Sequence, residues 1–157
     1  MRLLKYIRPT VQDNFTLAET YPYTTDAWCQ AHDFRGKGRR GVSGLCALPD
    51  GSLLVLEREL SFGGSNPLTA LSTASLFFAI YRVDTAPGGT RCCASEIRKE
   101  KLASGGGRVF TSGNYEGICL GPRLSDGTWS VLLVSDAGDG GSPPCILPMV
   151  LSLRSGQ

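Results

Sequence analysis

The chain has 157 residues, of which 41% are hydrophobic and 19% charged, with one histidine and a formal net charge of +2. This length supports one domain of ordinary size or a fragment of a larger one, and the near-neutral charge gives no reason to expect a nucleic acid or a membrane surface as partner. The 20 glycines and 9 prolines lie between short apolar runs, which argues against a helical bundle, and a single histidine excludes a multi-histidine metal centre within the chain.

Nine segments have the apolar, β-branched or aromatic content of strands and are bounded by turn-forming residues. In chain order they are Arg2–Ile7, 15–23, 42–48, 52–59, 76–84, 96–103, 115–121, Trp129–Asp136 and 149–154. Residues 96–103 suit either a strand or a short helix. Residues 53–56 show no polar alternation, so both faces of that strand are predicted to be covered. Nine strands without a long helical pattern predict an all-β fold.

An internal repeat indicates the architecture. Residues 44–49 align with residues 117–122 at an offset of 73, and Asp-Gly and an apolar strand follow each block. The apolar strands that follow the two blocks begin at residues 52 and 130, an offset of 78, which predicts a longer second turn. A repeated unit of strand, Asp-Gly hairpin and buried strand is typical of propeller blades. Four strands fall within residues 42–103, two precede them and three follow, which predicts a partial β-propeller of about two and a half four-stranded antiparallel blades.

Three glycine-rich stretches are interpreted as loops or linkers. Residues 61–75 are predicted to form an inserted loop, and Gly105-Gly106-Gly107 a linker between blades. Residues 36–41 match the string G-x-G-x-x-G but precede a strand, so the dinucleotide-binding interpretation fails its context. This basic loop either holds an anionic ester or is simply solvated.

The cysteines and the histidine match no common zinc-binding, redox or hydrolase motif. None of the six cysteines forms a C-x-x-C pair, which leaves zinc and redox sites without a motif. Cys46 and Cys119 lie in apolar runs and are predicted to be core residues. Adjacent Cys92 and Cys93 are a candidate reactive pair. His32 lacks an accompanying G-x-S-x-G nucleophile elbow.

Carboxylates at strand ends are the candidate metal-binding or catalytic groups. Glu116 begins one predicted inner strand and Asp136 ends the strand that pairs with it, so a blade brings both to one end near the central channel. With an oxygen from Asn114, they would suit a hard cation such as Ca²⁺. The alternative is that these groups are structural acceptors or are ion-paired with Arg58.

The repeated blocks resemble the phytase-like family of bacterial β-propellers, often described as having an esterase-like activity. The family pattern G-[IV]-S-x-L-x-A-L-x-D-G-x-L-L-V-L-E-R-E is matched by residues 41–59, and its I-Y-x-V-D strand by residues 80–84. A third block, N-x-E-G-[IL]-x-L-G-P followed by D-G and an apolar strand, is matched by residues 114–136. The family usually continues with further acidic residues or Asn, whereas residues 137–141 are Ala-Gly-Asp-Gly-Gly.

The resemblance implies that residues 1–157 are the C-terminal portion of a phytase-like domain that hydrolyses phosphate or carboxylic esters. Glu57, Arg58 and Glu59 lie at the matching strand end of the preceding blade, and we predict that they are catalytic residues lining the substrate side, with Ca²⁺ at Asn114, Glu116 and Asp136. The expected partners are a small anionic or ester substrate, and the missing propeller half or a second copy of the chain. Export is implied too, although the N-terminus shows no signal peptide. The alternatives are a non-catalytic propeller module that binds a ligand or protein, and an inactive remnant.

Overall fold

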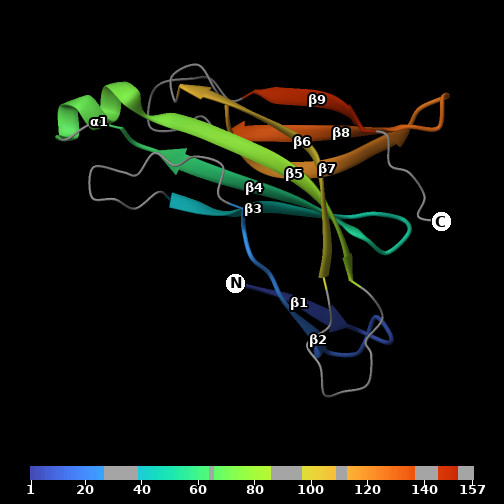
Figure 1. The fold of residues 1–157 in the computed structure, drawn as a ribbon. Coiled ribbons are helices and arrows are strands. Elements are labelled where there is room, and N and C mark those ends of the chain that lie inside the picture. Colours follow the sequence, from blue (N-terminus) through green and yellow to red (C-terminus); the bar gives the residue numbers. More distant parts are fainter. Residues whose placement is uncertain (27–38, 64–65, 86–96, 109–112, 137–144, 152–157) are drawn as a thin grey trace.

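The computed structural model describes residues 1–26, 39–63, 66–85, 97–108, 113–136 and 145–151. Nine strands form antiparallel sheets of two, four and three strands, each in sequence order (Figure 1). The strands are β1 Arg2–Ile7, β2 Thr16–Pro22, β3 Arg39–Ala47, β4 Leu53–Ser61, β5 Ser75–Thr85, β6 Ile97–Arg108, β7 Asn114–Arg123, β8 Trp129–Asp136 and β9 Ile146–Leu151. The predicted all-β partial propeller is confirmed, with the end of one blade, a whole blade and most of a third.

The four-stranded sheet lies between the other two sheets, with one core on each face (Figure 1). Side chains along a strand alternate between its faces. Val55 of β4 therefore packs with Tyr21 of the β1–β2 hairpin, whereas Leu54 and Leu56 pack with Leu133 of β8. The absence of polar alternation in residues 53–56 is thereby explained, because neighbouring sheets cover both faces of β4.

The two Asp-Gly turns have the same hydrogen bonds. In the first turn, Gly51 N donates to Leu48 O at 3.0 Å, and Ser52 N donates to Asp50 Oδ1 at 2.9 Å. The second turn, residues 124–128, repeats both bonds at the same distances. Gly51 and Gly127 have φ of 87° and 85°, a conformation that glycine adopts without steric cost. The repeat seen in the sequence is therefore a structural repeat.

The longer offset after the second block does not come from a longer turn. Both turns span five residues, 48–52 and 124–128. The additional residues lengthen the β7–β8 hairpin, whose register shifts between Leu120 and Arg123. The turn prediction was wrong because Gly121 and Pro122 look like turn residues, whereas the structure places them inside β7 as an irregularity.

Two segments predicted to be loops or linkers contain regular structure. Residues 61–75 include the short helix α1, Pro67–Thr73. Asn66 begins it, since its side-chain oxygen accepts from Thr69 N at 3.0 Å, as an N-cap does. Residues 97–103 of the ambiguous segment belong to β6, which continues through the three glycines predicted to link the blades. No helix in the described part of the chain is long and apolar enough to cross a membrane.

The glycines of β6 make room for the aromatic residues of β5. Gly105 pairs with Phe78 and Gly106 with Phe77. A Cβ on Gly106 would lie 2.5 Å from a ring carbon of Phe77 and 2.6 Å from Leu76 O. Because one of these contacts is backbone, a rotamer change would not relieve the clash.

Gly106→Ala is therefore expected to lower the free energy of unfolding by about 1–3 kcal/mol, as overpacking does. Chemical denaturation would measure it. Gly41→Ala in β3 is the matched control, because nothing lies within 4 Å of a Cβ there and the φ of Gly41 is not positive. Equal stability of the two variants would contradict the packing role given to Gly106.

The described cysteines differ in burial. Cys46 is partly buried and packs against the core shared with β7–β9, as expected. Cys119 is exposed, so its prediction as a core residue was wrong. Its place in β7 pairs with Leu132, on the face of that sheet opposite to the buried side chains of β8.

Cys92, Cys93, His32 and residues 36–38 of the predicted basic loop lie outside the described residues. The rest of that loop, residues 39–41, begins β3.

Candidate functional site

The first residues of β7 meet the four-stranded sheet at the junction between the two larger sheets. Ser43 of β3 donates from Oγ to Tyr115 O at 3.1 Å, and a Cβ on Gly44 would lie 3.0 Å from Ile118 Cγ2. The absence of a side chain at Gly44 thus allows β3 and β7 to approach closely. This contact brings the second half of β4 near the start of β7.

A bulge interrupts both β3 and β7 at equivalent positions of the repeat. The register shifts between Val42 and Gly44 in β3, and between Tyr115 and Gly117 in β7. The extra residue is Ser43 in the first case and Glu116 in the second. Bulges bend a strand and re-aim a side chain, often beside an active site. The sequence repeat thus places a carboxylate at the bulge of β7.

Arg58, Asn114 and Glu116 form a cluster at this junction, hereafter the junction cluster. Arg58 Nη1 lies 2.5 Å from Glu116 Oε1 and also donates to Asn114 Oδ1. Asn114 Nδ2 donates to the same Glu116 oxygen at 2.9 Å. The side chains of Arg58 and Glu116 are 38% and 40% exposed, so a ligand could reach both. Asp136 is exposed and is the cross-strand partner of Asn114.

The three adjacent residues predicted for the substrate side lie on two faces of β4. Arg58 projects toward β7, whereas Glu57 and Glu59 belong to the opposite face because strand side chains alternate. Glu57 is 0% exposed and Glu59 is 3% exposed. The structure therefore brings Arg58, Asn114 and Glu116 together, with Asp136 at the same strand end. It separates them from Glu57 and Glu59.

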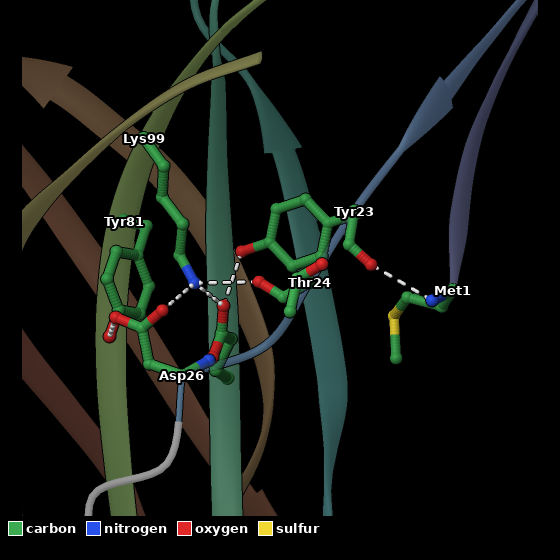
Figure 2. Close-up of polar contacts among 7 residues, drawn as sticks. Met1, Tyr23, Thr24, Asp26, Tyr81 and Lys99 are labelled. Atoms are coloured by element: carbon green, nitrogen blue, oxygen red, sulfur yellow. Dashed lines mark hydrogen bonds and ion pairs between the residues drawn. The ribbon is translucent and has the colours of Figure 1, made fainter. Parts of the chain in front are cut away.

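Glu57 lies at the centre of a second cluster, the buried network, with Tyr23, Asp26, Tyr81 and Lys99. Lys99 Nζ lies 2.5 Å from Glu57 Oε1 and 2.8 Å from Asp26 Oδ1. Tyr23 Oη donates to Glu57 at 2.5 Å, and Tyr81 Oη donates to Asp26 at 2.6 Å. Figure 2 shows Lys99 reaching the carboxylates beside the two tyrosine rings, and its Nζ lies 3.9 Å from the Tyr81 centroid. A buried charge requires such pairing.

The pKa shifts in this network keep its hydrogen bonds intact. Burial, and then the hydrogen bond to Glu57, raise the pKa of Tyr23, so its hydroxyl remains a donor. Burial alone would raise the pKa of Asp26, but hydrogen bonds from Lys99 and Tyr81 outweigh it and hold the pKa below its usual value. The network therefore joins the first hairpin to the complete blade through the ionised carboxylate of Asp26 and the neutral phenol of Tyr23.

The sequence interpretation missed four members of this network: Tyr23, Asp26, Tyr81 and Lys99. One signal was present, because Glu57 follows an apolar run predicted to be covered on both faces and so needed a buried partner. The sequence alone does not choose among the basic residues at 98–101. Lys99 is selected by the pairing of β6 with β5, which places it opposite Val83.

The calcium prediction fits this geometry poorly. The Glu116 and Asn114 oxygens already accept from Arg58, so a cation bound there would face a guanidinium charge. Within the described residues, no group of three or more His, Cys, Asp or Glu side chains is arranged to hold a metal ion. Calcium at Asn114, Glu116 and Asp136 stays a prediction.

The fold and the junction cluster define a class of protein: a partial antiparallel propeller with a guanidinium–carboxylate group between two blades. A family model described as "Phytase-like: Esterase-like activity of phytase" matches residues 1–137. Because the match covers most of the chain, the chain belongs to this phytase-like family. The resemblance seen in the sequence blocks is thereby confirmed. No curated protein and no solved structure matches the chain.

Proposed function

We propose that the chain acts in ester hydrolysis and that the junction cluster binds the anionic part of a phosphate or carboxylic ester. The observation that carries the proposal is the half-exposed Arg58 between two blades, held by Asn114 and Glu116. Planar guanidinium groups bind phosphate and carboxylate oxygens with two parallel hydrogen bonds. Membership of a phytase-like family supports ester chemistry at such a site.

Arg58 has donors left for a ligand. Its hydrogen bonds to the described residues come from Nη1, which leaves Nε and Nη2 to face an ester. Glu116 and Asn114 hold the guanidinium in one orientation, and a fixed charge stabilises the negative charge that develops on the ester oxygens. Glu57 and Glu59 lie on the other face of β4, so the proposal uses Arg58 of the three residues.

Asp136 is the candidate general base in this proposal. Its exposed carboxylate ends β8 opposite Asn114, at the edge where Arg58 would hold the ester. A water molecule would lose its proton to Asp136 while its oxygen attacks the phosphorus or acyl carbon. The ester bond then breaks, and the leaving alkoxide takes a proton from solvent. The products are an alcohol and the free acid.

Turnover of a chromogenic phosphomonoester and of a short chromogenic acyl ester tests this function. Glu116→Gln removes the charge that orients Arg58 but keeps the side-chain shape, so we expect turnover to disappear. Glu19→Gln is the matched control, because Glu19 forms an exposed pair with Lys5 on the β1–β2 hairpin. Full turnover in Glu116→Gln would contradict the site. Turnover of neither ester by the unaltered chain would favour a non-catalytic binding module or an inactive remnant.

A further inference from the structure

Two sheet faces at opposite ends of the chain are apolar and exposed. In the three-stranded sheet, Val134, Ile146 and Val150 are 43%, 64% and 60% exposed. In the first hairpin, Leu4 and Tyr6 are 50% and 51% exposed, on the face opposite to buried Leu3. We call these the trailing face (Cys119, Leu132, Val134, Ile146, Pro148 and Val150) and the leading face (Leu4, Tyr6 and Leu17).

The internal repeat shows what the trailing face is built to contact. Gly44 pairs with Leu56 just after the bulge of β3, and Gly117 pairs with Val134 just after the bulge of β7. Val134 and Leu132 are therefore equivalent to Leu56 and Leu54. In the complete blade, Leu54 and Leu56 are 0% exposed because the following sheet covers them. The trailing face carries the same apolar character at the same positions, so it suits another sheet.

The leading face lies on the other side of the central sheet from the trailing face and points in the opposite direction. The β1–β2 hairpin covers the complete blade with the face that carries Leu3 and Tyr21. Its other face therefore points to where a preceding blade would lie. A trailing face and a leading face are the two halves of one blade-to-blade contact, and each chain has one of each on opposite sides of the central sheet (Figure 1).

We propose that a second copy of the chain docks its leading face on the trailing face, continuing the contact between blades that already occurs twice within one chain. Two copies related by a twofold axis make this leading-to-trailing contact twice, once in each direction, and so close a ring. The described residues of each chain form about two and a half blades, so two copies supply about five. Closed propellers contain about 4–8 blades.

Light scattering and sedimentation of the full chain test this assembly. We expect a dimer, with a mass about twice 16.8 kDa. Val134→Lys and Leu4→Glu should each halve that mass, because each places a charge in an apolar contact. Both positions are exposed within one chain, so an unchanged circular dichroism spectrum would show that folding is retained. Val11→Lys is the matched control, since Val11 is 77% exposed and lies outside both faces.

Mixing the two variants identifies the geometry. In a mixed head-to-tail dimer, one contact sets lysine against glutamate and the other is unaltered, so equal amounts should restore the dimer mass. A dimer lost with Val134→Lys, kept with Leu4→Glu and not restored by mixing would overturn the proposal in favour of trailing face on trailing face. A monomer at all concentrations would overturn it as well and assign both faces to a propeller half on another polypeptide.

Discussion

Lys99→Met is expected to lower the free energy of unfolding by about 3–5 kcal/mol, the cost of leaving a buried ionic partner uncompensated. Glu57 is 0% exposed, and Lys99 Nζ at 2.5 Å is the cation that contacts it among the described residues. The same ammonium binds Asp26 at 2.8 Å and Thr24 O at 3.1 Å. Methionine keeps the length of the side chain, so the loss in free energy of unfolding reports the removal of the positive charge. Urea denaturation with a two-state fit would measure it.

A double variant separates the buried charge from general damage to packing. Glu57→Gln in the Lys99→Met background removes the unpaired carboxylate, so part of the lost stability should return. Lys5→Met is the matched control, because its pair with Glu19 is exposed and such pairs contribute little. If Lys5→Met and Lys99→Met lowered stability equally, the buried network would not be what joins the first hairpin to the complete blade.

Arg58→Gln is expected to lower kcat/KM for a chromogenic phosphomonoester by about 10²–10³-fold, the loss seen when one donor to a developing oxyanion is removed. Glutamine still reaches toward Asn114 and Glu116 but carries no charge and lacks the guanidinium fork. Arg58→Lys restores the charge without the fork and should recover only part of the rate, because bidentate binding is lost. Steady-state kinetics of the three proteins would show this order.

The same substitutions distinguish a catalytic role of Arg58 from a structural one. Arg58 is 38% exposed and its ion pair with Glu116 is partly solvated, so its removal should change stability much less than Lys99→Met. Thermal unfolding of the Arg58 variants provides this comparison. A large loss of stability with unchanged kcat/KM would contradict the proposed site and make Arg58 a link between blades.

The alternation of Glu57, Arg58 and Glu59 explains why adjacent residues have different roles. The complete blade contacts a sheet on each face, so consecutive residues of β4 point into different interfaces. Glu57 joins the buried network with the first hairpin, and Arg58 joins the junction cluster with β7. Residues 57–59 of β4 thus contribute to two different contacts between sheets.

The sequence alone determined the strands, their grouping and the family. Period-two patterns and turn residues act over a few positions, so β1 and β8 had the predicted bounds and the two Asp-Gly turns were located correctly. Local patterns failed where a glycine has a packing role. Gly105, Gly106 and Gly107 resemble a linker, yet they lie in β6, where the aromatic rings of β5 fill the space that side chains at Gly105 and Gly106 would need.

The tertiary structure alone decided which side chains meet. Arg58 and Glu116 are 58 residues apart in the chain, and Lys99 and Asp26 are 73 apart. No local pattern encodes these distances, because they follow from the register of paired strands and from the packing of one sheet on another. The sequence therefore indicates carboxylates at strand ends as candidate functional side chains. Their pairing with Arg58, and the separation of Glu57 and Glu59 from them, arose when the blades packed.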